Sequence, residues 1–247
     1  MNAENENRVK ILGVPMDLID SGQAMALFEE KFPEPGLTMI VTPNPEIVLA
    51  ANKDESLKTL ISGADIILPD GVGLLYASKI IGHPLKERVT GIDFLMDILD
   101  YLEKNGKSVF FFGSKPGVAR DAARNLQKKY PALKVAGTRN GYFKPEEEEE
   151  IVREINESGA DFLCVALGAP KQEQFIEKYR KELRCGGAIG VGGSLDVFSG
   201  NLKRAPEFYR NHGLEWLYRL IQEPSRYKRM MQLPVFMVKV ILHGRKQ

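Results

Sequence analysis

The chain has 247 residues, 43% of them hydrophobic, and a formal net charge of +1 at pH 7. This length and composition suffice for one sizeable buried core, and the near-neutral charge argues against a general nucleic-acid binder. Two isolated cysteines and three scattered histidines form neither a disulfide framework nor a zinc site, so we expect no metal from them.

The N-terminal residues, MNAENENRVK, lack the apolar stretch of a signal peptide. No apolar run reaches the roughly 18 residues expected of a membrane-spanning helix. We therefore expect a cytoplasmic protein.

Short β-rich runs alternate along the chain with longer segments of helical period. The predicted strands are KILGV (10–14), TMIVT (38–42), DIILP (65–69), SVFFF (108–112), LKVAG (133–137), FLCVAL (162–167) and AIGVG (188–192). The amphipathic stretches between them are 46–61, 93–104, 117–129, 146–158 and 171–183. Nearly all the strand runs are apolar on both faces, as buried parallel strands are. The pattern predicts an α/β, Rossmann-like fold with a largely parallel sheet covered by helices.

Glycines and polar side chains follow almost every predicted strand. These exits read TPNPE (42–46), PDGVG (69–73), GSKPG (113–117), GTRNGYF (137–143), GAPKQE (168–173) and GGSLD (192–196). Any one of them is explained equally well as a tight turn. Because the carboxyl ends of parallel strands meet at one edge of the sheet, the six together favour a ligand cleft there.

Several common motifs are missing from these loops. The sequence contains no GxGxxG after the first strand, no GxxxxGK[ST] and no GxSxG, which argues against a Rossmann dehydrogenase, a P-loop enzyme and a serine hydrolase. We expect no cofactor. Aspartates never occur as DxD, a spacing that holds a divalent ion on a sugar-nucleotide diphosphate in many enzymes. If a diphosphate leaves here, arginine side chains must neutralise it.

The C-terminal segment is basic and partly apolar. From Arg204 onward there are nine Lys/Arg and three Asp/Glu residues. On helical geometry Arg219, Arg226 and Arg229 fall on one face, although Pro224 interrupts the helix. We predict a core over 1–200 and a helical, membrane-docking appendage over 201–247. The alternative is a C-terminal helix pair packed on the core with solvated arginines.

Six of these segments, in this order, resemble the WecG/TagA/CpsF family of bacterial glycosyltransferases, and most closely its TagA branch. They are VTPNPEIV, LPDGVG, ERVTGID, LGAPKQE, GVGGSLDVFSGNLKRAP and GLEWLYRLIQEPSRYKRM. The resemblance covers about residues 10 to 240. It implies inverting transfer of N-acetylmannosamine from UDP-N-acetylmannosamine to C4 of the GlcNAc on undecaprenyl diphosphate, the start of the wall teichoic acid linkage unit.

Within that reaction a carboxylate must take the proton of the acceptor hydroxyl, and Asp70 is our choice. Partial burial behind an apolar strand would raise its pKa into a useful range, whereas its alternative role is a loop or N-cap aspartate. Thr42 and Asn44 offer a hydroxyl and an amide for sugar hydroxyls, or else cap a turn. The resemblance places Thr42 beside the base.

Two further site residues follow from the resemblance, and the others from the groups that they can offer a nucleotide. Gln172 and Arg88 are pocket residues, with a plain surface charge as the alternative for Arg88. Tyr142 would stack on the uracil, unless it packs as a strand-edge aromatic. Backbone amides of Gly192 and Gly193 and the carboxylate of Asp196 would hold the nucleotide. The arginines 219, 226 and 229 would cover the diphosphate, so the reaction would need no metal.

The implied partners are a UDP-sugar, a lipid-linked GlcNAc diphosphate and the inner face of the cell membrane. Relatives also use N-acetylmannosaminuronic acid, glucuronic acid or glucose, so the donor stays open. A non-catalytic nucleotide-binding module recruited to the membrane is a second hypothesis, and an oxidoreductase a third. The apolar residues of the tail would also permit self-association, which leaves the oligomeric state open.

Overall fold

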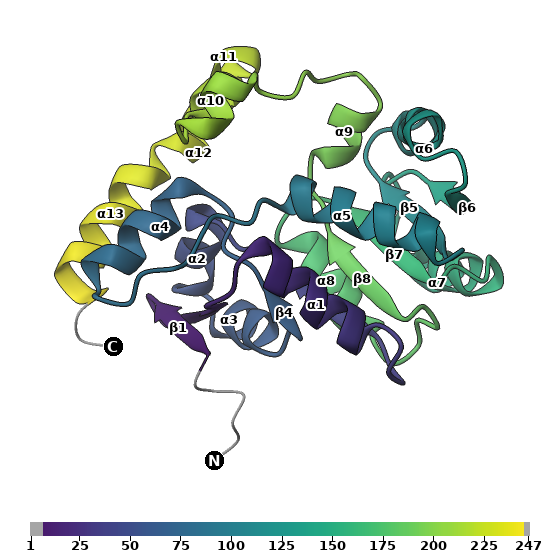
Figure 1. Cartoon of the computed structure of the whole chain (residues 1–247), viewed down its shortest axis with the longest axis horizontal. Helices are drawn as coiled ribbons and strands as arrows, with labels where there is room; N and C mark the ends of the chain where they lie inside the picture. The colour runs from purple at the N-terminus through teal and green to yellow at the C-terminus, as the bar shows by residue number, and fades with distance from the viewer. Residues whose placement is uncertain (1–6, 245–247) are drawn as a thin grey trace.

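A computed structural model describes residues 7–244. Its main sheet has six strands in the order β4-β3-β8-β7-β5-β6, and every neighbouring pair is parallel. The strands are β3 (Thr38–Val41), β4 (Ile66–Ile67), β5 (Ser108–Gly113), β6 (Lys134–Arg139), β7 (Phe162–Ala166) and β8 (Gly187–Gly190). Helices cover both faces of this sheet (Figure 1). The predicted α/β class with a parallel sheet and C-terminal helices is confirmed.

Between residues 7 and 202, nine α-helices alternate with these strands. They are α1 (Ser21–Lys31), α2 (Pro45–Ala51), α3 (Glu55–Ser62), α4 (Val72–Ile80), α5 (Gly91–Lys104), α6 (Val118–Lys129), α7 (Glu148–Glu157), α8 (Lys171–Lys178) and α9 (Ser194–Phe198). A 3₁₀ turn, η2 (Pro145–Glu147), leads into α7. The predicted helical stretch 46–61 is in fact two helices, because Asp54 caps a second start at α3.

The sheet separates two apolar cores. Side chains of β5 alternate between them: Phe110 and Phe112 face the core shared with α2, α3, α4, α7 and α8, whereas Phe111 faces the core shared with α1, α5 and α6. All three are almost completely buried. A strand buried on both faces has no polar face, which explains why these runs are apolar throughout.

The predicted strand 10–14 is wrong as a member of the parallel sheet. Residues 8–17 form an antiparallel hairpin of β1 (Arg8–Ile11) and β2 (Val14–Asp17). Gly13 turns the chain with φ +82°, which glycine adopts without strain. The hairpin is anchored beside β4, because the Asp17 carboxylate accepts a hydrogen bond of 2.7 Å from the Ile67 amide. It therefore lies beside the edge strand of the sheet.

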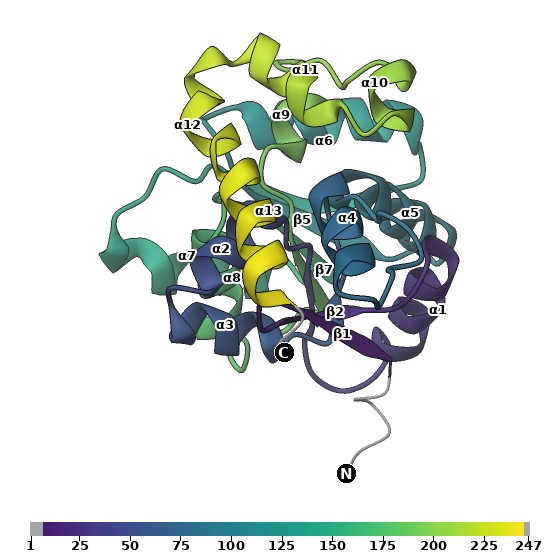
Figure 2. The ribbon, with the colours of Figure 1, turned by 90° about the vertical axis from the view of Figure 1, so that its left-hand side faces the viewer.

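Residues 207–243 of the described part of the chain form an arm of four helices and one 3₁₀ turn. These are α10 (Glu207–Asn211), α11 (Glu215–Gln222), η3 (Pro224–Arg226), α12 (Tyr227–Met230) and α13 (Gln232–His243). Helix α13 lies against α2 and α4 (Figures 1 and 2). Its Phe236 and Val240 are fully buried in the core on that side of the sheet. Helix α13 is therefore packed on the body of the protein. Helices α10 to α12 connect it to the segment that follows α9.

The predicted boundary at residue 200 stays a prediction, and the outermost residues of both predicted domains, 1–6 and 245–247, lie outside the described residues. Between residues 7 and 244, none of the helices combines the length and apolar character that crossing a bilayer requires.

Candidate active site

Asp70 lies just beyond β4, at the carboxyl end of the sheet. Its backbone amide donates to the Pro43 carbonyl at 2.9 Å, which joins the loop after β4 to the loop after β3. Its carboxylate accepts a hydrogen bond of 3.4 Å from the Gly91 amide, at the first residue of α5. The side chain is partly buried.

Burial raises the pKa of Asp70 to about 6. Arg88 and Arg219 lower this pKa, whereas the negative charge of Glu215 raises it. A carboxyl group with a pKa near 6 is ionised at neutral pH and is still basic enough to accept a proton. The residue is also not a helix N-cap, because Gly71 occupies that position of α4.

Thr42 meets the same end of α5. A Cβ atom on Gly91 would lie only 2.9 Å from the Thr42 hydroxyl oxygen, so this glycine makes room for the threonine. Asp70 and Thr42 are therefore neighbours of one residue, Gly91, although they follow different strands. Asn44, two residues on, uses its side-chain oxygen to accept a 3.0 Å hydrogen bond from the Ile47 amide and caps α2. The capping role that we considered for Asn44 is present.

Arg88 is a partly buried residue of the loop that leads into α5, and it is no solvated surface charge. Its Nη2 lies 3.2 Å from the Glu215 carboxylate of α11, and only 17% and 13% of the two side chains are exposed. Arg219, one turn further along α11, lies 3.6 Å from the other oxygen of Glu215. The arm thus brings Glu215 and Arg219 to the same place as Arg88 and Asp70.

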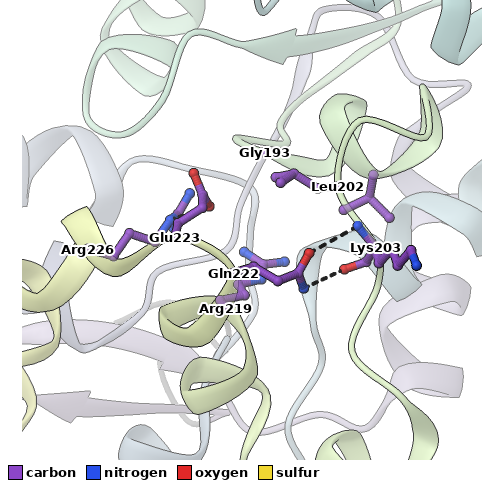
Figure 3. Close-up of a pocket in the computed structure, with 8 residues that line it drawn as sticks. Gly193, Leu202, Lys203, Arg219, Gln222, Glu223 and Arg226 are labelled. Carbon is purple, nitrogen blue, oxygen red and sulfur yellow. Dashed lines mark hydrogen bonds and ion pairs between the residues drawn. The ribbon is translucent and has the colours of Figure 1, made fainter.

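A pocket lies between the arm and the segment after β8. Gly193, Val197 and Leu202 line it from the body of the protein, and Arg219, Glu223 and Arg226 line it from the arm (Figure 3). The Gln222 side chain closes the two sides together, since it accepts from the Lys203 amide at 3.2 Å and donates to the Lys203 carbonyl at 3.0 Å. Two predicted diphosphate arginines and one predicted nucleotide glycine therefore share a pocket.

The three arm arginines do not lie on one continuous helix. Arg219 belongs to α11, Arg226 ends the 3₁₀ turn η3 and Arg229 belongs to α12, because Pro224 breaks the helical path. Arg226 pairs with Glu223 at 2.6 Å. Arg229 pairs with Glu46 of α2 at 2.7 Å and is not among the residues that line the pocket. The expected single arginine face is therefore replaced by a pair at the pocket and one arginine bound to the body.

Gln172 is buried in α8, with 4% exposure. Its side-chain oxygen accepts a 3.0 Å hydrogen bond from the Gly192 amide, and its amide group donates to Glu173 at 2.8 Å. Gly190 leaves space for it, since a Cβ there would lie 2.5 Å from the Gln172 nitrogen. The geometry makes Gln172 the support of the Gly192–Gly193 loop.

The predicted nucleotide residues lie at the ends of β6 and β8. Tyr142 is 67% exposed, so the alternative of a packed strand-edge aromatic is wrong. Asp196 lies in the first turn of α9 and accepts a 3.4 Å hydrogen bond from the Ser114 hydroxyl. Ser114 also binds the loop after β6, because its carbonyl accepts from the Gly141 amide at 2.8 Å.

The sequence patterns did not select two residues of this region, Glu215 and Ser114. Ser114 stands in the GSKPG exit and adopts φ +58°, a left-handed conformation that serine rarely takes. Glu215 precedes Arg219 by four residues, the spacing of a helical ion pair, and that spacing was the available signal. Within residues 7–244 no group of three or more His, Cys, Asp or Glu side chains is placed to hold a metal ion.

Comparison with known proteins identifies the relatives of this chain. A family profile described as "Glycosyl transferase WecG/TagA/CpsF family" matches residues 9–247. A protein of Bacillus spizizenii strain W23 is 42% identical over 206 residues, which are 83% of this chain and 79% of that protein. A Bacillus subtilis strain 168 protein is 38% identical over 203 residues, covering 82% and 78% of the two chains. A Staphylococcus aureus strain MW2 protein is 34% identical over 244 residues, covering 98% and 95%. Each of the three is named an N-acetylglucosaminyldiphosphoundecaprenol N-acetyl-beta-D-mannosaminyltransferase.

Proposed function

The chain belongs to the WecG/TagA/CpsF family of glycosyltransferases, and from this premise we propose that it transfers N-acetylmannosamine from UDP-N-acetylmannosamine to the GlcNAc of undecaprenyl-diphosphate-linked GlcNAc. The names of the three relatives support this donor sugar and this acceptor. The observation that carries the proposal is Asp70, a partly buried carboxylate with a pKa of about 6, which shares the neighbour Gly91 with Thr42 and lies within electrostatic reach of Arg88 and Arg219.

Asp70 acts as the general base in this proposal. Its carboxylate takes the proton of the acceptor hydroxyl while that oxygen attacks the anomeric carbon of the donor sugar. The new bond joins the acceptor oxygen to the anomeric carbon, and the bond from that carbon to the diphosphate oxygen breaks. UDP leaves with the electron pair of that bond, and because the acceptor oxygen attacks from the opposite face in a single step, the configuration at the anomeric carbon inverts. The Thr42 hydroxyl, held at the same end of α5, orients the attacking sugar.

Arginine side chains stabilise the departing diphosphate. Arg219 and Arg226 line the pocket beside Gly193, and Arg88 lies close enough to Asp70 to lower its pKa. Guanidinium groups bind phosphate oxygens through paired N–H donors, and such contacts supply the charge stabilisation that the leaving group needs. The nucleoside would lie beside the Gly192–Gly193 loop, toward Asp196 and the exposed ring of Tyr142.

The outer face of the arm provides a surface for the membrane that carries the acceptor. On α13 the residues Val235, Val238, Ile241 and Leu242 are all more than half exposed, and Met231 before it is 64% exposed. Exposed apolar side chains beside Lys and Arg residues are typical of segments that lie in a lipid interface. We propose that the protein binds the cytoplasmic face of the membrane in this way and that 201–231 completes the active site there.

The test is a transfer assay with one lipid-linked GlcNAc acceptor and a panel of UDP-sugars, with and without EDTA. We expect UDP release that depends on the acceptor, a strong preference for UDP-N-acetylmannosamine and no loss in EDTA. UDP binding without acceptor-dependent release from any donor would instead indicate a nucleotide-binding module. Release with another UDP-sugar would reassign the donor, and loss of activity in EDTA would refute the role of the arginines.

A further inference from the structure

Glu215 is the only residue of the described arm whose carboxylate contacts two of the proposed diphosphate arginines. Its Oε2 lies 3.2 Å from Arg88 Nη2, and its Oε1 lies 3.6 Å from Arg219 Nη2. The Arg88 and Glu215 side chains are only 17% and 13% exposed, so their contact is screened less than one in bulk water, whereas the Arg219 side chain is 39% exposed. Glu215 thus joins a cation of the body to a cation of the arm.

Without this carboxylate the two arginines would repel each other. A shared anion removes that cost, and it also fixes the position of α11 relative to the loop before α5. Both contacts use a terminal Nη2 nitrogen, whereas a guanidinium carries five N–H donors. Each arginine therefore keeps donors for a phosphate oxygen while Glu215 holds it.

Two simpler roles are open to the Glu215 carboxylate. An acidic residue in the first turn of a helix stabilises the helix dipole, and Glu215 occupies that position in α11. Alternatively, the carboxylate could occupy the phosphate position itself and compete with the ligand. These roles predict different effects of its removal on nucleotide binding.

We infer that Glu215 is a positioning residue of the diphosphate site, which holds Arg88 and Arg219 together so that both bind the diphosphate of the donor. This inference rests on the proposed function, because it takes the diphosphate as the ligand of these arginines. Glu215 itself does not touch the substrate and acts through the two guanidinium groups.

The test is a double-mutant cycle on the full chain, read out as UDP affinity by calorimetry. In the wild-type background Glu215→Gln is expected to weaken UDP binding about tenfold, the scale of one hydrogen bond to a charged group. In an Arg219→Gln background the same change should have a smaller effect, because Glu215 then has only Arg88 left to hold. Glu215→Asp, which keeps the charge, should recover part of the affinity.

Glu207→Gln is the matched control, since Glu207 is an exposed residue in the first turn of α10, and it should bind UDP like the wild type. Equal losses in both backgrounds would assign Glu215 a purely structural role and overturn the inference. Tighter binding by Glu215→Gln would make the carboxylate a competitor and would overturn it too. If the wild-type chain binds no UDP at all, the proposed function fails together with the inference, whereas wild-type binding with an unaffected Glu215→Gln variant removes the inference alone.

Discussion

The Gly91 amide donates a 3.4 Å hydrogen bond to the Asp70 carboxylate, and a Cβ on Gly91 would lie 2.9 Å from the Thr42 hydroxyl oxygen. The start of α5 therefore fixes the base and its neighbour against each other. Thr42 follows β3 and Asp70 follows β4, and Gly91 is the first residue of α5. The relative position of the two side chains therefore depends on these two strands and on α5.

The pH dependence of transfer should report the ionisation of Asp70. Burial raises its pKa to about 6, and only the ionised carboxylate can accept a proton. Activity is therefore expected to be low at pH 5, to rise through pH 6 and to level off above pH 7. The measurement is kcat/KM for the acceptor across this range at constant ionic strength. An acidic limb that lies near pH 4 would mean that another group, or an unperturbed carboxyl, acts as the base.

Gly91→Ala should disturb Thr42 without adding a charge. The new methyl group would approach the Thr42 hydroxyl oxygen to 2.9 Å, which is too close, so the threonine side chain must move. We expect kcat to fall by about a factor of ten or more, since small misplacements of positioning groups have effects of this order. Gly22→Ala, in the first turn of α1 where the nearest atom is 3.5 Å away, serves as the control. Unchanged kcat in Gly91→Ala would show that the position of Thr42 is unimportant.

Helix α13 should contribute substantially to the stability of the body. Phe236 is fully buried, so Phe236→Ala is expected to cost about 3–5 kcal/mol in the free energy of unfolding. Val238→Ala, on the exposed side of the same helix, should change it by less than about 0.5 kcal/mol. Chemical denaturation of both variants measures the difference. Equal effects of the two variants would mean that α13 is not docked in solution.

Deletion of everything beyond residue 200 would remove Phe236 and Val240, so a truncated core should be destabilised as well as inactive.

The exposed side of α13 should decide membrane binding. Replacing both Ile241 and Leu242 by Gln removes apolar surface that is 60% and 62% exposed, and it should weaken sedimentation with anionic vesicles several-fold while leaving UDP binding intact. Tyr76→Gln removes a comparably exposed apolar side chain from α4 and is the control. Wild-type sedimentation of the double variant would place the lipid contact elsewhere on the protein.

The sequence predicted the parallel sheet well because its strands carry a strong and simple signal. Runs such as 108–112 are apolar on both faces, and only a sheet covered on both sides requires that. The hairpin over 8–17 was missed because Leu12 and Gly13, which both adopt positive φ in its turn, stand inside an apolar run without a typical turn sequence. The sequence left open whether the apolar C-terminal segment packs on the core or contacts a membrane. Phe236 and Val240 are buried on one face of α13, while Val238 and Ile241 are exposed on another. Both faces are apolar, so the sequence pattern alone does not show which one packs on the core.

Only part of the candidate site was predictable from the sequence. Loops that follow parallel strands converge by topology, so the chain positions of Asp70 and Thr42 pointed to the site, whereas Gln172 and Arg88 were selected from the family resemblance. The contacts between Arg88 and Glu215 join residues 127 positions apart, and nothing local in the sequence specifies such a pair. The support that Gln172 gives to Gly192 was missed for the same reason.

Transfer by the Asp70→Asn variant is the most direct test of Asp70 as the base. With UDP-N-acetylmannosamine and lipid-linked GlcNAc, we predict a fall in kcat of about a hundredfold or more, with UDP affinity unchanged. Asp100→Asn, which alters a half-exposed aspartate paired with Lys104 on α5, should retain full activity. Turnover by Asp70→Asn at the rate of the wild type would contradict the assignment of Asp70 as the group that takes the proton.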